Sequence, residues 1–338
     1  MAETLKALGE FGLIRRIRDL LKREGAKPSR DLTVGVGDDA AAFKPRPGYE
    51  LLVTCDSVVE GRHYLPRFMQ PRDIGRRAMV LNISDIGAMG GRPRYALVSL
   101  GLRAEISIDD VEELYRGFLD ELKAFQAVII GGNITSTGNE LFIDITLIGD
   151  AREGRVLCRS RAAPGDVILV TGYPGESNAG MRLLVRGLAP EDHPLAKRYI
   201  RPSHRAREGA AVAETGHVTA MIDTSDGFLG DLGHLCEESG VGAELVQEKF
   251  PLSRALKEAA TRLKEEAQEC FLGTSDDYEL IMTCAPEHVE AVRAALSATY
   301  TGPVTEVGRV TEAGRGIRLL TADGSEKTLT PEGWDHFK

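Results

Sequence analysis

Aspartates follow short apolar runs at several points along this chain of 338 residues, in segments rich in Gly and Ser. A carboxylate at the end of an apolar run is held where a strand leaves a core, and several such ends repel one another unless cations lie among them. Oxygen ligands without His or Cys partners suit Mg²⁺, and substrate phosphates commonly complete its shell. The pattern therefore predicts phosphate chemistry. The segments are Gly37-Asp38-Asp39, Thr54-Cys55-Asp56-Ser57, Asn82-Ile83-Ser84-Asp85, Ile222-Asp223-Thr224-Ser225-Asp226-Gly227 and Ser275-Asp276-Asp277-Tyr278.

The elements that must position these acids alternate between helices and strands, which predicts an α/β (α+β) fold. Expected helices cover 11–23, 71–89, 107–125, 228–239, 253–268 and 286–297, and two more begin at Glu176 and His204. Expected strands cover 32–36, 51–54, 95–102, 127–130, 141–148, 166–171, 218–222 and 280–284. A polar, basic stretch over 151–164 indicates a boundary near residue 155, giving domains at 1–155 and 156–338.

Composition narrows the class of protein. The formal net charge of −9, with no stripe of Lys and Arg, argues against a nucleic-acid partner. No apolar run is long enough to cross a membrane and the first residues lack a signal-peptide core, so a cytoplasmic location is expected. The five cysteines are widely spaced without a CxxC pair and are predicted to be reduced.

A dinucleotide fingerprint and a P-loop are both disfavoured. Gly35 to Ala40 fits GxGxxA formally, but Pro45 and Pro47 follow too soon for the long helix that a Rossmann turn opens. A glycine-permitted loop that presents Asp39 to a metal is the favoured interpretation. No Walker A sequence is present, which argues against a P-loop kinase.

Four weaker signals each admit two interpretations. Gly131-Gly132-Asn133 is either a hairpin turn or a phosphate-binding nest. His63 is either structural or part of a site, and Arg159 is either solvated or a clamp for a nucleotide phosphate. Trp334, the only tryptophan, either ties down the C-terminal segment or stacks on a heteroaromatic ring.

Taken together, the motifs resemble those of the thiamine-monophosphate kinases. The matching segments, in order, are GVGDDAAAF, TCDSVVEGRHY, NISDIGAMGGRP, GGN, PGDVILVTG, IDTSDGFLGDL, SDDYEL and GWDHF. Several are shared with the wider superfamily of aminoimidazole ribonucleotide synthase, while the His63 segment and the GWDHF ending favour the kinases. The resemblance implies an N-terminal dimerisation and metal/ATP-binding domain whose sheet pairs across a homodimer, a C-terminal α/β domain, ATP bound between them and no P-loop.

The resemblance also implies roles for individual residues. Several Mg²⁺ ions would be held by Asp39, Thr54, the backbone of Cys55, Asp56, Asp85, Asn133, Asp223 and Asp226. ATP would contact Tyr115, Gly132, Asn133, Arg159 and Ser225, and thiamine monophosphate would contact His63, Asp276 and Trp334. Two residues depart from the family pattern: Asn133 stands where many relatives have Asp, and Asp276 stands where Glu is usual.

The implied reaction is direct in-line transfer of the ATP γ-phosphoryl group to thiamine monophosphate. The phosphate nucleophile has a second pKa of about 6 and needs no dedicated base, so no side chain is expected to act as one. Two alternatives stay open: a ligase resembling aminoimidazole ribonucleotide synthase, and a catalytically silent nucleotide-binding dimer. A homodimer is expected independently, because the N-terminal half has few strands for its apolar content and its sheet edge needs a cover.

Overall fold

The computed structural model describes residues 3–333, which divide into two compact units. Unit 1 takes residues 3–86 and 91–153, and unit 2 takes 87–90 and 154–333. The division after residue 153 falls next to the boundary predicted near residue 155. The assignment of 87–90 to unit 2 was not predicted. Both units mix helices with sheets, which confirms the predicted fold class.

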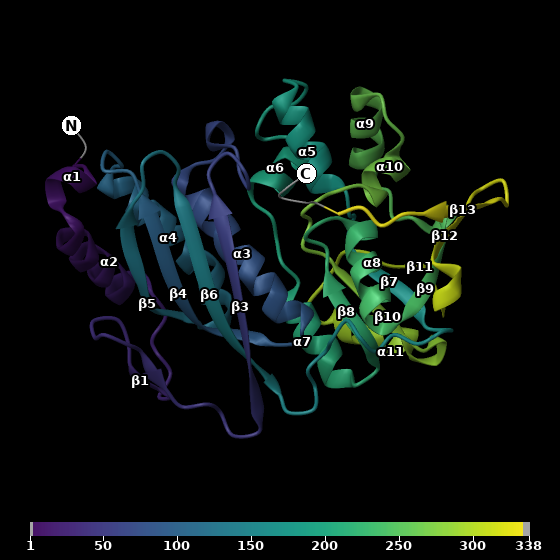
Figure 1. The fold of residues 1–338 in the computed structure, drawn as a ribbon, viewed down its shortest axis with the longest axis horizontal. Coiled ribbons are helices and arrows are strands. Elements are labelled where there is room, and N and C mark those ends of the chain that lie inside the picture. Colours follow the sequence, from purple (N-terminus) through teal and green to yellow (C-terminus); the bar gives the residue numbers. More distant parts are fainter. Residues whose placement is uncertain (1–2, 334–338) are drawn as a thin grey trace. The chain divides into compact units, whose positions relative to one another are not determined.

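Unit 1 is built around a four-stranded sheet (Figure 1). Its helices are α1 (Leu5–Leu8), α2 (Glu10–Glu24), α3 (Pro71–Ala88) and α4 (Ile108–Leu122), and its strands are β1 (Leu32–Val34), β2 (Ala42–Phe43), β3 (Tyr49–Val59), β4 (Arg92–Leu102), β5 (Val128–Ser136) and β6 (Phe142–Arg152). The order β3-β6-β4-β5 leaves β3 and β5 at the edges. Only β4 and β5 run parallel.

Alternation along β3 explains which side of the unit 1 sheet is covered. Leu52 and Val58 are buried, whereas Leu51 and Val53 are 46% and 66% exposed. Helices α3 and α4 cover one face (Figure 1), and Ser107 begins α4 as predicted by accepting the Asp109 N–H at 3.2 Å. The second face of β3 therefore carries apolar side chains that nothing in the unit covers.

Unit 2 is built around a seven-stranded sheet of order β13-β12-β9-β11-β7-β10-β8. Its strands are β7 (Val167–Thr171), β8 (Val218–Asp223), β9 (Val241–Val246), β10 (Leu280–Cys284), β11 (Val304–Glu312), β12 (Ile317–Leu320) and β13 (Glu326–Leu329). Its helices are α5 (Glu176–Val185), α6 (Pro194–Ile200), α7 (Ala206–Thr215), α8 (Phe228–Ser239), α9 (Arg254–Leu263), α10 (Ala267–Leu272) and α11 (Val289–Ser297).

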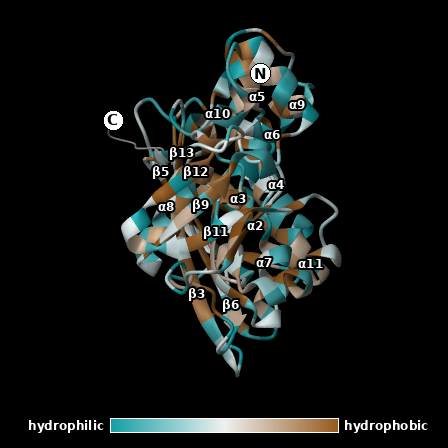
Figure 2. Ribbon diagram, turned by 90° about the vertical axis from the view of Figure 1, so that its right-hand side faces the viewer, coloured by the Kyte–Doolittle hydropathy of each residue, from teal (hydrophilic) through white to brown (hydrophobic). Residues whose placement is uncertain are grey.

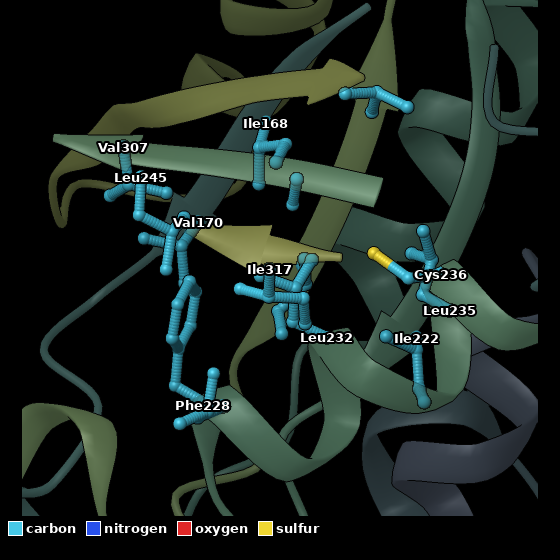
Figure 3. Packing of buried hydrophobic residues seen from close by; sticks show 14 of the residues in the cluster. Ile168, Val170, Ile222, Phe228, Leu232, Leu235, Cys236, Leu245, Val307 and Ile317 are labelled. Atoms are coloured by element: carbon cyan, nitrogen blue, oxygen red, sulfur yellow. The ribbon is translucent and has the colours of Figure 1, made fainter. Parts of the chain in front are cut away.

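The unit 2 sheet has a core on both faces, because β7 and β10 are mostly apolar and buried at every position. Ile168 and Val170 of β7 pack toward Phe228 and Leu232 of α8 (Figure 3). The alternate residues of β7 pack with apolar side chains of α7 and α11. Hydrophobic residues accordingly concentrate along the strands, while hydrophilic residues are frequent on helices and loops (Figure 2). This two-sided core holds the ends of β8 and β10 rigidly.

One predicted element was wrong, four strands were missed, and one of two open alternatives was eliminated. The helix predicted over 253–268 is two helices, because Lys264 adopts a left-handed conformation with φ of 62° after α9. Strands β9, β11, β12 and β13 were not predicted. Gly131 to Asn133 form no hairpin turn, since β5 runs through them and pairs with Leu97 to Ser99 of β4.

Two expectations about the chain as a whole were also tested. All five cysteines are free thiols, as predicted. Among residues 3–333, no helix is both long and apolar enough to cross a bilayer.

Candidate active site

Unit 2 presents its acids on two loops that are bonded to each other where β8 and β10 meet. Asp223 ends β8 and pairs in register with Leu280. Thr224 donates its N–H to the Glu279 carbonyl at 2.8 Å, and its hydroxyl oxygen accepts the Glu279 N–H at 3.0 Å. Its carbonyl accepts the Tyr278 N–H at 2.8 Å. The two acidic motifs therefore form one rigid assembly.

Asp231 holds the loop that follows β8. Its Oδ2 accepts the N–H of Asp226 at 3.1 Å and that of Gly227 at 3.0 Å. Gly227 has φ of +116°, and a Cβ there would lie 2.3 Å from the Gly273 carbonyl oxygen, so only glycine fits. Burial, and then the charges of Asp223 and Asp226, raise the pKa of Asp231 well above its usual range. Asp223 and Asp226 therefore lie close enough to Asp231 for their charges to act on it.

The loop with Asp276 and Asp277 lies against the first turn of α5. Asp277 accepts the N–H of Gly175 at 2.6 Å and that of Ser177 at 2.8 Å. Burial raises the pKa of Asp277 to about 7, although these two N–H groups lower it. Asp276 accepts the Ser177 hydroxyl at 2.6 Å. The two neighbouring acids therefore have different partners. Asp277 accepts hydrogen bonds from two backbone N–H groups, and Asp276 accepts one from a side-chain hydroxyl.

A buried ion pair lies behind these loops. The Glu279 carboxylate, 4% exposed as a residue, accepts the Arg205 Nε–H at 2.7 Å and the Thr171 hydroxyl at 2.6 Å. The Arg205 guanidinium also lies 4.8 Å from the centroid of the Tyr300 ring. Burial is the largest single effect and lowers the pKa of Arg205, but the charge and the hydrogen bond of Glu279, with smaller effects of Tyr300 and Glu208, together raise the pKa above its usual range. The pair fixes Glu279, whose backbone in turn holds Thr224.

Unit 1 brings three of the predicted ligands together where β3 lies beside α3. Thr54 donates its hydroxyl to Oδ2 of Asp85, and Asp56 donates its N–H to Oδ1 of Asn82 at 3.3 Å. Asn82 is fully buried and also donates to the Ala78 carbonyl at 3.2 Å. The side chains of Thr54 and Asp85 are therefore neighbours, and the backbone of Asp56 is fixed to the same helix.

The His63 ring is oriented by the backbone N–H of Val59, four residues earlier. Its Nδ1 accepts the Val59 N–H at 3.0 Å, and its carbonyl accepts Nε–H of Arg77 at 3.0 Å. Because Nδ1 accepts a hydrogen bond, the neutral ring carries its proton on Nε2. His63 can therefore act as a donor through Nε2, which suits a phosphate oxygen.

Other predicted ligands lie apart from this arrangement. Asp39 is exposed on a short loop, where its N–H bonds Oδ1 of Asp38 at 3.1 Å. Strand β2 follows instead of a helix, which confirms that no Rossmann turn is present. The Cys55 thiol is exposed and lies 3.4 Å from Oδ1 of Asp144. The role of the Cys55 backbone as a ligand stays a prediction.

The predicted ATP contacts are scattered. Tyr115 is 4% exposed within α4, and its ring packs edge-on to Phe118 at 5.3 Å. Gly132 and Asn133 are part of β5. Arg159 and Ser225 are exposed on unit 2. Among the predicted substrate contacts, Trp334 lies outside the described residues.

The predicted metal ligands are divided between the two units, with Asp223 and Asp226 in unit 2 and the others in unit 1. Within residues 3–333, no three His, Cys, Asp or Glu side chains are arranged as a group that could hold a metal. The donors near the acidic loops are nevertheless carboxylate and hydroxyl oxygens, the chemistry that Mg²⁺ prefers.

Sequence reasoning did not identify the residues that hold the loops: Ser177, Arg205, Asp231, Asp277 and Glu279. Two signals were available. Asp231 follows Gly227 by four residues at the start of a helix, the spacing at which an acid reaches back to N-terminal N–H groups. Two further acids, Asp277 and Glu279, stand beside Asp276 in one short segment, which is more than a single ligand needs.

The fold and these loops define a class that comparison with known proteins confirms. Residues 37–151 match the N-terminal domain of AIR synthase related protein, and residues 163–320 match its C-terminal domain. The chain is thus a two-domain protein of the AIR synthase related class.

Individual relatives narrow the assignment. The thiamine-monophosphate kinase of Bacillus subtilis is 33% identical over 311 residues, covering 90% of this chain and 94% of the relative. The crystal structure of the thiamine-monophosphate kinase from Stenotrophomonas maltophilia is 33% identical, with a TM-score of 0.80 over 94% of this chain and 98% of that one. AaThiL complexed with AMPPCP and TMP is 33% identical, with a TM-score of 0.75 and full coverage of both chains. The chain belongs to the thiamine-monophosphate kinase family.

Proposed function

We propose that this chain transfers the γ-phosphoryl group of ATP to the phosphate of thiamine monophosphate, giving thiamine diphosphate and ADP. The observation that carries the proposal is the full-length similarity to AaThiL, which was solved with AMPPCP and TMP. The rigid pair of acidic loops in unit 2 supports it, because such loops suit a reaction between two polyanions.

In the proposed reaction, an oxygen of the thiamine monophosphate phosphate attacks the γ-phosphorus of ATP. A new P–O bond forms, the bond to the β–γ bridging oxygen breaks, and ADP leaves with that oxygen. The nucleophile, with a second pKa of about 6, is largely ionised at neutral pH. The protein therefore supplies position and charge, and no side chain has to remove a proton.

Mg²⁺ is the cofactor that fits the donor set. We assign several Mg²⁺ ions to Thr54, Asp56 and Asp85 within unit 1 and, separately, to Asp223 and Asp226 within unit 2. Asp39, Asn133 and the Cys55 backbone are assigned as further ligands in unit 1. The mutual repulsion of Asp223, Asp226 and Asp231 supports this assignment. When bound, Mg²⁺ supplies neutralisation of phosphate charge.

The remaining residues orient the two substrates. We assign Arg159, Ser225, Tyr115 and Gly132 to the nucleotide, with Arg159 as a cationic contact to phosphate. His63, Asp276 and Trp334 are assigned to thiamine monophosphate. The Nε2 donor of His63 suits its phosphate, and the carboxylate of Asp276 suits its cationic ring.

We also propose that the chain forms a homodimer through the unit 1 sheet. Strand β3 is an edge strand, and Val53 on its uncovered face is 66% exposed. An exposed apolar edge strand favours pairing with another chain. Pairing with a second copy covers the β3 edge of each copy symmetrically.

The test is an assay of thiamine diphosphate and ADP formation by the full-length protein with ATP, thiamine monophosphate and Mg²⁺. Formation of both products in equal amounts is expected, and chelation of Mg²⁺ with EDTA should abolish it. The acyclic ribonucleotide precursor of aminoimidazole ribonucleotide is the rival substrate. ADP formation with that precursor and not with thiamine monophosphate would overturn the proposal in favour of a ligase. ADP formation with neither would indicate a silent nucleotide-binding protein.

A further inference from the structure

The first turn of α5 donates several hydrogen bonds to the acidic loop at 275–277. Gly175 and Ser177 donate their N–H groups to Asp277, at 2.6 and 2.8 Å. Asn178 donates its N–H to the Ser275 hydroxyl oxygen at 3.1 Å. The Asn178 side chain also donates to the Thr274 carbonyl. These bonds hold the loop against α5, and a further bond joins the Ser177 hydroxyl to the Asp276 carboxylate.

The Ser177 hydroxyl differs from the other donors in what it holds. It donates to Oδ1 of Asp276 at 2.6 Å, the short distance typical of a hydroxyl bonded to a carboxylate. Ser177 is 1% exposed, so packing fixes its side chain, whereas Asp276 is only half-buried. A buried donor thus sets the direction of a more accessible carboxylate.

We propose that Ser177 is a positioning residue for the acceptor substrate, because its hydroxyl directs the Asp276 carboxylate toward the cationic ring of thiamine monophosphate. This inference rests on the proposed function. Asp276 is one methylene shorter than the Glu usual at this position, so its carboxylate reaches less far and depends more on its direction. Ser177 acts through Asp276 and contacts neither substrate itself.

The expected kinetic effect is confined to one substrate. Without the hydroxyl, Asp276 samples several rotamers and its attraction for the cationic ring weakens. Ser177→Ala should raise KM for thiamine monophosphate roughly five- to tenfold, less than the loss of a direct charge-assisted hydrogen bond to the substrate, because Asp276 keeps its charge and loses only its direction. KM for ATP should change less than twofold, because the bond serves the acceptor side only.

A matched control lies at the same helix. Ser253 donates its hydroxyl to Oε1 of Glu176 at 2.6 Å, so it makes the same type of bond to the first residue of α5. Ser253 also begins α9 by accepting the Leu256 N–H at 3.0 Å. Ser253→Ala should lower the melting temperature and leave both KM values unchanged, which separates a structural loss from a positioning loss.

The experiment compares Ser177→Ala, Asp276→Ala, the double variant and Ser253→Ala in the full-length protein with Mg²⁺ and ATP. The quantities measured are the two KM values, kcat and the melting temperature. If Ser177 acts through Asp276, the double variant should have the KM of Asp276→Ala alone, because the hydroxyl has nothing left to direct.

Three results would overturn the inference. The first is an unchanged KM for thiamine monophosphate in Ser177→Ala while Asp276→Ala raises it, which would leave the proposed function intact. The second is independent, multiplicative effects in the double variant. The third is a wild-type protein that neither binds thiamine monophosphate by calorimetry nor phosphorylates it, which would refute the proposed function together with the inference.

Discussion

Replacement of Asp231 tests whether its carboxylate serves as a hydrogen-bond acceptor or as a charge. Asp231→Leu removes the acceptor and substitutes a larger side chain with the same branching, whereas Asp231→Asn removes the charge and keeps a carbonyl oxygen at nearly constant volume. The site is 2% exposed, and its Oδ2 accepts two backbone N–H groups, those of Asp226 and Gly227. The two variants should therefore behave differently.

The magnitude follows from the two bonds. A buried N–H left without an acceptor costs about 1–3 kcal/mol, so Asp231→Leu should lose roughly 2–6 kcal/mol of unfolding free energy. That loss is a large share of the 5–15 kcal/mol typical of a folded protein but does not abolish folding. Asp231→Asn keeps an acceptor and relieves repulsion with Asp223 and Asp226, so its loss should stay below about 1 kcal/mol.

Calorimetric melting and turnover at varied Mg²⁺ measure the two consequences. Asp231→Leu should melt roughly 4–24 °C lower, given a loss of about 2–6 kcal/mol and about 2–4 °C per kcal/mol for a unit of this size. It should also need more Mg²⁺ for half-maximal turnover, since Asp226 is no longer held. Asp231→Asn should melt within about 4 °C of the wild type. Its Mg²⁺ concentration for half-maximal turnover should lie within a few-fold of the wild-type value.

Either of two results would refute this reasoning. If both variants melted at the wild-type temperature, the bonds to Asp226 and Gly227 would not stabilise the loop. If Asp231→Asn lost as much turnover as Asp231→Leu while its melting temperature stayed normal, the charge would matter and Asp231 would be a direct ligand.

Four further predictions concern other parts of the chain. Asp56→Asn and Asp85→Asn should each lower kcat by orders of magnitude in the ADP assay while the melting temperature holds, because we assign both acids to Mg²⁺. Trp334→Ala should raise KM for thiamine monophosphate about tenfold and leave KM for ATP unchanged if the indole stacks on the substrate; a loss of stability alone would assign it to anchoring. Burial lowers the pKa of His204 to about 4, so its stabilising contribution is present above pH 6.5 and is lost as pH falls toward 4; denaturant titrations should show a loss of at most about 3 kcal/mol, absent in His204→Asn. Val53→Asp should yield a monomer by light scattering, and a dimer that persisted would place the interface elsewhere.

Elements with local signals were predictable from sequence, and elements defined by their neighbours were not. The helix predicted over 228–239 coincides with α8, because Gly227 and Gly240 mark its ends. Strand β11 has charged residues and a glycine among its nine positions, a local pattern typical of a loop. It becomes a strand because β7 and β9 pair with it on both sides, and no local pattern reveals that pairing.

The candidate site shows the same limit in its acids. The strand end at Asp223 was predictable, since five mostly apolar residues precede it. The different roles of Asp276 and Asp277 were not predictable, because both stand in one motif with the same side chain. Their roles depend on which of them faces the N–H groups of Gly175 and Ser177, and those residues lie about a hundred positions earlier in the chain.

The acids of unit 2 can be divided by what their oxygens accept. Asp231 and Asp277 each accept two backbone N–H groups, and Glu279 accepts a guanidinium and a hydroxyl, so these three hold the loops in place. Asp223 and Asp226 lie on the loop that Asp231 holds, and they repel its charge. Such repulsion is costly in the free protein and is relieved when a cation binds, so the rigid acids maintain the arrangement that makes the others useful. Replacing an acid of the first kind with a side chain that cannot accept these hydrogen bonds should therefore lower stability and activity together, whereas substituting Asp223 or Asp226 should lower activity and leave stability unchanged or higher.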